Sequence, residues 1–124
     1  YSFAGHFRSV NISKGGFVFP AGRFIPDNMR IFEEEILSQL PDYYPNQQAL
    51  IKDIAKVHGE LLFIHPFREG NGRTSRILAN LMARKQGYPG LNFRRINFDE
   101  YIIAVQQVAR KDYSKMEKII AYTF

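Results

Sequence analysis

The sequence has 124 residues, 45% of them hydrophobic, which is enough apolar material for one packed domain, and its lack of cysteine excludes disulfides and thiolate metal sites. The formal charge of +5 favours an anionic partner without distinguishing nucleic acid, lipid and nucleotide. Apolar runs are too short to span a bilayer, and residues 1–10 lack a signal-peptide core. We expect a single domain over residues 1–124, trimmed at the N-terminus because it starts at Tyr1, and trimming at the C-terminus is left open.

Residues 11–26 contain the β-structure that we expect. Gly15 and Gly16 interrupt any helix, and "FVF" (17–19) is typical of a short strand. The "PAG" segment (20–22) predicts a turn that leads into a second strand at "RFI" (23–25). A two-stranded hairpin is marginally stable alone, so we expect it to pack against a helical body.

Two helices should follow the hairpin. Asp27 is placed to cap the first, and Pro41 ends it. Asn46 is placed to cap the second, which must end near His65 because a residue before proline disfavours helical backbone. Their expected apolar faces are Phe32, Ile36 and Leu40 in the first helix, and Leu50, Ile54, Val57, Leu61 and Ile64 in the second.

Three more helices are expected, over residues 72–86, over 97–109 and from 112 onward. Gly87 is a helix stop, and Asn97 followed by Glu100 is a capping-box pattern. The side chains expected inside are Ile77, Leu78, Leu81, Met82, Met116, Ile119 and Ile120. The sequence therefore predicts an all-α fold, a helical bundle with one short β-hairpin.

The segment "HPFREGNGRTSR" (65–76), between the second and third helices, has the composition of a binding site. Arg73 and Arg76 lie one turn apart where positive charge opposes the helix dipole. Such charges destabilise the helix unless an anion is bound. A bound anion would accept hydrogen bonds from two guanidinium groups and from free backbone N–H groups, which would stabilise the segment. Glycines on both sides of Asn71 permit an anion-binding turn. These features predict a polyphosphate ligand.

Glu69 and His65 add chemistry to this ligand site. A carboxylate beside phosphate is repulsive unless a cation lies between them, and Mg²⁺ often binds one protein carboxylate plus phosphate oxygens. Glu69 is therefore the candidate magnesium ligand. His65 is the candidate general base, because an imidazole with an unperturbed pKa of about 6.5 is mostly neutral at pH 7. Together they predict transfer from a nucleotide to a hydroxyl group.

The same segment resembles the signature of the Fic family, H-x-F-x-[D/E]-G-N-G-R-x-x-R, at every fixed position. Upstream, "FAG" (3–5), "NISKGGF" (11–17) and the hairpin are similar to the family's opening segment and its target-docking flap. The resemblance implies a Fic-type helical bundle. The matching positions are His65, Phe67, Glu69, Gly70, Asn71, Gly72, Arg73 and Arg76.

The resemblance implies a protein adenylyltransferase. Such an enzyme moves AMP from Mg-ATP to a Ser, Thr or Tyr hydroxyl of a target protein docked on the flap, and it releases pyrophosphate. The intact "GNGR" argues against transfer of a terminal phosphate. The resemblance implies that His65 is the general base and that Glu69 holds the α- and β-phosphates through Mg²⁺. Gly70, Asn71 and Gly72 would form the phosphate cradle, Arg73 would bind the β-phosphate, and Arg76 would bind the γ-phosphate. Phe67 would anchor the loop in the core.

Three further residues are candidates for the nucleotide site. Phe24 and Ile25 can pack as strand residues or clamp a target side chain over the site. Tyr101 mainly belongs to a helix start, yet its ring could border the adenine. His58, seven residues before His65, is expected to be a packed histidine.

Alternative functions stay open. Base selectivity depends on pocket walls, so another nucleoside triphosphate could replace ATP, and the domain could be a catalytically idle scaffold. A non-catalytic, helical nucleic-acid-binding domain would spread arginines along a helix face. Here "ILANLMAR" (77–84) is expected to be largely buried, so we expect neither a nucleic-acid nor a membrane partner.

Control of the activity is a final expectation. Similar Fic proteins are restrained by a helix bearing [S/T]-x-x-x-E-[G/N], whose glutamate pairs with the arginine corresponding to Arg76. That motif is absent from the sequence. We expect Arg76 to lack such a partner here, and we expect inhibition by an antitoxin-like protein or by a missing helix. The chain would then be a toxin-like enzyme of the cytoplasm, or one delivered into a host cytoplasm.

Overall fold

The computed structural model describes residues 4–124, so Phe3 of the "FAG" segment lies outside the described residues. The described chain is helical apart from one two-stranded hairpin, which confirms the predicted fold class. Its elements are β1 (Ser13–Lys14), β2 (Phe17–Val18), η1 (Gly22–Phe24), α1 (Ile25–Glu35), η2 (Leu37–Gln39), α2 (Gln47–Ile64), α3 (Asn71–Lys85), η3 (Phe93–Arg95), α4 (Phe98–Val108) and α5 (Ser114–Thr123), where η denotes a 3₁₀ helix.

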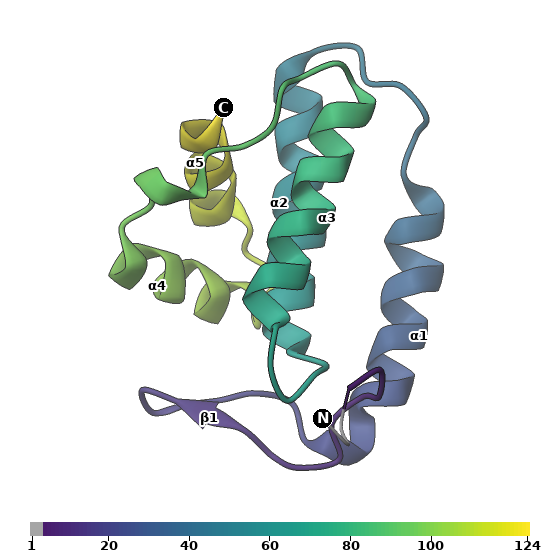
Figure 1. Ribbon diagram of the computed structural model, residues 1–124, viewed down its shortest axis with the longest axis vertical. Coiled ribbons are helices and arrows are strands. Elements are labelled where there is room, and N and C mark those ends of the chain that lie inside the picture. The colour runs from purple at the N-terminus through teal and green to yellow at the C-terminus, as the bar shows by residue number, and fades with distance from the viewer. Residues whose placement is uncertain (1–3) are drawn as a thin grey trace.

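Helix α2 is the centre of the fold. It contacts α3, α4, α5 and α1, and Figure 1 shows α2 and α3 side by side, with α1 on one side of the pair and α4 and α5 on the other. The predicted cap is confirmed, since the Asn46 side chain accepts a hydrogen bond from the Ala49 N–H at 2.8 Å. The predicted end at His65 is also confirmed. Within residues 4–124, no helix has the length and apolar character needed to cross a membrane.

Two hydrophobic clusters lie on opposite sides of α2. The larger joins α2 to α3, α4 and α5, and the smaller joins it to α1. The five side chains expected to face inward from α2 are all buried. They divide between the clusters, with Leu50 and Ile54 in the larger and Val57, Leu61 and Ile64 in the smaller.

The hairpin forms, but its turn is not where the sequence indicated. Ser13 pairs with Val18 in an antiparallel register, so the chain reverses at Gly15–Gly16 and not at residues 20–22. Both glycines have positive φ, 55° and 81°, a conformation that two-residue hairpin turns require. Figure 1 shows the hairpin crossing beneath the end of α2 and α3 where those helices are joined.

The predicted second strand at residues 23–25 is wrong. Gly22–Phe24 is a 3₁₀ helix, and Ile25 begins α1, two residues before the proposed cap Asp27. Pro26 explains this start, because its fixed φ and missing N–H suit the first turn of a helix. Ile25 is fully buried between α1 and α2, whereas Phe24 is about half exposed.

The buried face of α3 also differs from the prediction. Ile77 and Leu81 are 56% and 58% exposed, and the residues buried in the body of the helix are small: Ser75, Ala79 and Ala83. Small side chains at a spacing of four let α3 approach α2 closely. The expectation that residues 77–84 are largely buried is therefore wrong for Ile77 and Leu81, which lie on the exposed side of α3.

The last two helices follow the predicted pattern. The Asn97 side chain caps α4 by accepting a hydrogen bond from the Glu100 N–H at 3.1 Å. Helix α5 begins at Ser114, whose N–H and hydroxyl both donate to the Asp112 carboxylate. The three side chains expected inside α5 are buried: Met116, Ile119 and Ile120.

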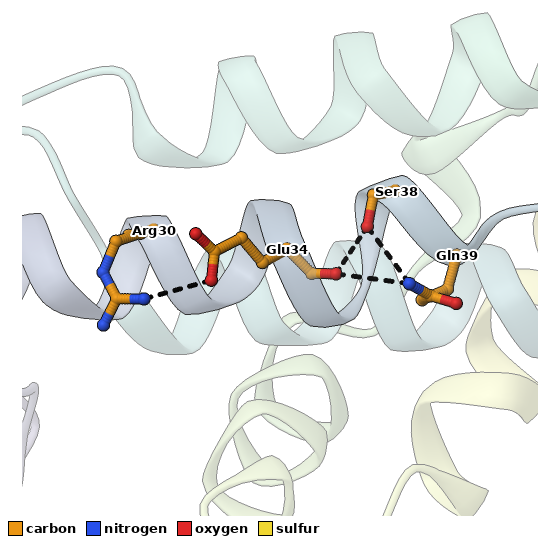
Figure 2. Close-up of polar contacts among 4 residues, drawn as sticks. All are labelled: Arg30, Glu34, Ser38 and Gln39. Atoms are coloured by element: carbon orange, nitrogen blue, oxygen red, sulfur yellow. Dashed lines mark hydrogen bonds and ion pairs between the residues drawn. The ribbon is translucent and has the colours of Figure 1, made fainter.

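Polar side chains on the exposed face of α1 form hydrogen bonds and an ion pair near the end of the helix. Arg30 and Glu34 form an ion pair of 3.0 Å between successive turns. Figure 2 shows Ser38 and Gln39 donating to the Glu34 carbonyl oxygen, where α1 gives way to η2. These donors supply partners that the last carbonyls of a helix lack.

Candidate active site

His65 lies at the point where α2 ends. Its backbone is left-handed, with φ 53° and ψ 59°, a region that residues other than glycine seldom adopt. The imidazole is buried and stacks on the Phe19 ring, with 4.0 Å between the ring centroids. The end of the helix and the hairpin segment therefore fix the ring from two sides.

The hydrogen bonds of His65 define its protonation. Its Nδ1 lies 3.1 Å from the Leu62 carbonyl oxygen, which can only accept, so Nδ1 carries the proton and Nε2 keeps a lone pair. Burial lowers the pKa of His65 to about 4, and the nearby charges of Lys14 and Arg8 act in the same direction. The ring is therefore neutral at pH 7 and able to accept a proton at Nε2.

Arg8 supports this site from below the backbone of His65, and sequence reasoning missed it. Only 2% of it is exposed, and its guanidinium donates to the carbonyl oxygens of His65 (2.5 Å), Ile64 (3.1 Å), Val10 (2.8 Å) and Pro20 (2.7 Å). The last carbonyls of a helix lack partners and carry partial negative charge, which an arginine matches. Arg8 thereby holds the unusual backbone of His65. Nothing local marks this arginine, since the carbonyls lie 56 and 57 residues away in sequence.

The loop between α2 and α3 is closed by Asn71. Its side chain accepts from the Phe67 N–H at 2.8 Å and donates to the Phe67 carbonyl oxygen at 2.7 Å. Phe67 is half-buried and packs on the exposed ring of Phe7, so the buried Asn71 amide anchors the loop more firmly than the phenyl ring does. Gly70 supplies the positive φ of 84° that precedes α3.

The structure divides the predicted site residues into two groups. His65, Gly72, Arg76 and Tyr101 line one cavity of about 150 Å³, with apolar walls that include Phe19. Glu69, Gly70 and Arg73 line a second, more open groove, next to Thr74. Neither set of lining residues includes Phe24 or Ile25, and the complete burial of Ile25 is incompatible with clamping a target side chain.

Tyr101 reaches the first cavity from α4, and its hydroxyl is engaged. It bonds to His58 Nε2, and the Arg76 guanidinium, which lines the same cavity, lies close enough for its charge to act on the hydroxyl. Burial raises the pKa of Tyr101, against the opposing effect of the Arg76 charge. His58 is the packed histidine that the sequence predicted, fully buried with Nδ1 3.0 Å from the Ser75 carbonyl oxygen.

A metal ion at this site would need ligands from the substrate. Glu69 is exposed on the loop, and residues 4–124 contain no cluster of three His, Cys, Asp or Glu side chains that could hold an ion unaided. One exposed carboxylate in the same groove as Arg73 fits Mg²⁺, which would complete its shell with phosphate oxygens and water.

Comparison with known proteins identifies the family. The model of the Fic/DOC family matches residues 1–83 of the chain. The chain belongs to the Fic/DOC family. This Fic domain is 29% identical over 95% of its length to the protein adenylyltransferase Fic of Nematostella vectensis, and 32% identical over 94% to that of Aedes aegypti. It spans about a quarter of the length of these relatives, 27% and 23%.

The fold of the Fic domain is shared with solved structures. The BepC protein of Bartonella tribocorum, a VirB-translocated effector crystallised with AMPPNP, superposes with a TM-score of 0.76 at 19% sequence identity. The match covers 99% of this chain and 66% of BepC. It confirms the Fic-type arrangement of the helices and the hairpin.

Proposed function

We propose that this Fic domain transfers AMP from Mg-ATP to a Ser, Thr or Tyr hydroxyl of a target protein, with release of pyrophosphate. The observation that carries the proposal is a neutral His65, with its proton on Nδ1, in the same cavity as Gly72 and Arg76. The names of the relatives, protein adenylyltransferase, support it, as does the AMPPNP bound to BepC.

In the proposed reaction, His65 acts first. Its Nε2 accepts the proton of the target hydroxyl while the hydroxyl oxygen attacks the α-phosphorus. The bond from the α-phosphorus to the oxygen bridging toward the β-phosphorus breaks, and pyrophosphate leaves. The Leu62 carbonyl, which accepts from Nδ1–H, stabilises the imidazolium that forms.

The phosphates would be bound by the beginning of α3. Free N–H groups in its first turn and the guanidinium of Arg76 supply positive charge. Asn71 would contribute through its backbone, since its amide closes the loop. Gly72 leaves room for Arg76, because a Cβ there would lie 2.9 Å from Nη1 of that arginine. Gly70 and Arg73 would extend the cradle into the neighbouring groove, toward the β-phosphate.

Glu69 would hold Mg²⁺ in this scheme. When bound, the ion supplies positive charge that screens the carboxylate from the phosphates and stabilises the leaving pyrophosphate. The exposed position of Glu69 on the loop supports this role.

The target protein is proposed to dock on the hairpin. An added strand beside β1 or β2 would pair through main-chain groups, which tolerates varied target sequences. Because residues 23–25 are not a strand, the docking edge is limited to β1 and β2. The contact of Phe19, which follows β2, with His65 links this edge to the proposed base.

Inhibition of AMP transfer is proposed to come from a group outside the described residues. The ion pairs within residues 4–124 join Arg30 to Glu34, Lys85 to Asp42 and Lys111 to Glu60, so Arg76 has no carboxylate partner among them. An antitoxin-like protein or an inhibitory helix would supply that carboxylate. A toxin-like role in the cytoplasm, or in that of a host, agrees with the absence of cysteine and with the translocated Bartonella effector among the structural neighbours.

Labelled nucleotides test the proposal. The domain is incubated with candidate lysate and with ATP labelled at either the α- or the γ-phosphate. Protein label from the α-position alone is expected, and it should be lost in His65→Ala. Label from the γ-position would mean phosphate transfer instead. Competition by unlabelled GTP or CTP tests whether another triphosphate is preferred, and equal labelling by the His65 variant would contradict the proposal.

A further inference from the structure

Arg76 needs a fixed geometry to act as proposed, and its own position does not supply one. It lies in the second turn of α3 and is only half-buried. A free arginine side chain samples many rotamers, and ordering it on binding costs free energy. The structure places a residue on each of two sides of it: Gly72 lies against the guanidinium, and Tyr101 lines the same cavity, with its hydroxyl close enough to be affected by the arginine charge.

The hydrogen bonds around Tyr101 run in one direction only. The Ser75 carbonyl can only accept, so His58 donates through Nδ1–H. Burial lowers the pKa of His58 to about 4, so the ring is neutral and its Nε2 must accept from the Tyr101 O–H. The Tyr101 oxygen is then left with lone pairs that are available to accept from the Arg76 guanidinium, which lines the same cavity.

This chain of donors joins three helices. His58 comes from α2, Tyr101 from α4, and Arg76 and Ser75 from α3. Both rings are buried and stack with 5.7 Å between centroids and 27° between planes, so neither can rotate freely. The hydroxyl therefore has a set direction at the edge of the cavity that holds His65.

We propose that Tyr101 is a positioning residue whose hydroxyl, oriented by His58, holds the Arg76 guanidinium ready for the terminal phosphate of the nucleotide. This inference rests on the proposed function, in which the cavity binds ATP. It assigns Tyr101 a role through Arg76 in place of a direct contact with adenine. Tyr101 would thereby help the domain to distinguish triphosphates from diphosphates.

Tyr101→Phe tests the inference, because it keeps the ring and its stack on His58 but removes the hydroxyl. We expect the dissociation constant for ATP to rise about 3- to 10-fold, as loss of one hydrogen bond predicts, while that for ADP stays unchanged. Isothermal titration calorimetry with both nucleotides measures the ratio of the dissociation constant for ATP to that for ADP. Tyr113→Phe is the matched control, since it removes another part-buried tyrosine hydroxyl, bonded to Glu60, and should leave the ATP-to-ADP ratio unchanged.

A double-mutant cycle separates positioning from general destabilisation. In the Arg76→Ala background, Tyr101→Phe should have no further effect on ATP binding, because the residue through which it acts is missing. If Tyr101→Phe does not fold, His58→Leu replaces it, since it removes the acceptor that orients the hydroxyl and should likewise raise the dissociation constant for ATP relative to that for ADP.

The outcomes are distinguishable. A wild-type domain that binds neither nucleotide overturns the proposed function and this inference with it. A wild-type domain that binds ATP while Tyr101→Phe keeps the full preference over ADP overturns only the positioning role. Additive effects of Tyr101→Phe and Arg76→Ala would also overturn it.

Discussion

The loop between α2 and α3 and the β1–β2 hairpin face the same end of the molecule but are built differently (Figure 1). In the loop, buried polar side chains fix the backbone, with Arg8 on the His65 carbonyl and Asn71 on both polar groups of Phe67. The hairpin has strands of two residues, and Val18 is 68% exposed. Groups that carry out chemistry need a fixed geometry, whereas a docking edge must accept varied partners.

Aromatic side chains connect the two regions. The Phe17 ring meets that of Phe19 edge-on, with 5.1 Å between centroids, and Phe19 stacks on His65. The hairpin segment therefore contacts the rigid loop through the Phe17 and Phe19 rings, while the backbone edge of its strands stays accessible. The following predictions test whether rigidity and accessibility are divided in this way.

The largest effect is expected in the rigid region. His65→Ala should reduce AMP transfer by about 10²- to 10⁴-fold, because a general base contributes that much to a rate. The melting temperature and ATP binding should change little, since the phosphate contacts lie on α3. Initial rates with ATP labelled at the α-phosphate measure the loss. A rate equal to that of the wild type would remove His65 from the mechanism.

The next effect concerns the buried arginine. Arg8→Met should lower the free energy of unfolding by about 3 kcal/mol, because four carbonyl oxygens lose their donors while the side-chain volume is largely kept. Urea denaturation measures it. The exposed Arg23 is the matched control, and Arg23→Met should stay within about 0.5 kcal/mol of the wild type. Equal effects in the two variants would contradict the role given to Arg8.

Acid should weaken the packing around the two buried histidines, His58 in α2 and His65 at its end. Burial lowers the pKa of His58 and His65 to about 4, below the unfolded value of about 6.5. Between these values the unfolded chain binds more protons, so the stabilisation is complete above pH 6.5 and is lost as the pH falls toward 4. His58 alone should account for on the order of 2 kcal/mol between pH 7 and pH 5.

Urea denaturation at pH 7 and pH 5 checks this dependence. His58→Gln should reduce the loss of stability on acidification, and His6→Gln, at an exposed position, should leave it unchanged. An identical loss in His58→Gln and the wild type would contradict the assignment.

The smallest effect on stability is expected in the hairpin. Val18→Pro removes a backbone donor from β2 and should reduce target modification several-fold, because proline does not support strand pairing. ATP binding and the melting temperature should change little. Titration with ATP and labelling of targets are compared in the same preparation. Parallel loss of both would show that the hairpin supports the fold rather than docking.

Local signals predicted much of the fold. Asn46 and Asn97 cap helices where the sequence indicated, and the proline after His65 ends α2. The capping side chains bond N–H groups three residues away, so these features are visible in short windows. The hairpin turn was misplaced because Pro20 also suits a turn, and the pair Gly15–Gly16 was interpreted as a helix breaker only.

The sequence alone determined which groups are available for chemistry, since the complete signature from His65 to Arg76 lies in twelve consecutive residues. Tertiary structure decided how those groups are held. It placed small residues of α3 in the buried face and left Ile77 exposed. Two helices approach each other most closely where their facing side chains are small, so close packing and not side-chain size decided which face of α3 is buried. Tertiary structure also brought Arg8 to His65 and Tyr101 to His58, across 57 and 43 residues. Partners at such separations are fixed only when the helices meet, because burial and hydrogen bonding then choose among many arginines and tyrosines that look alike in sequence.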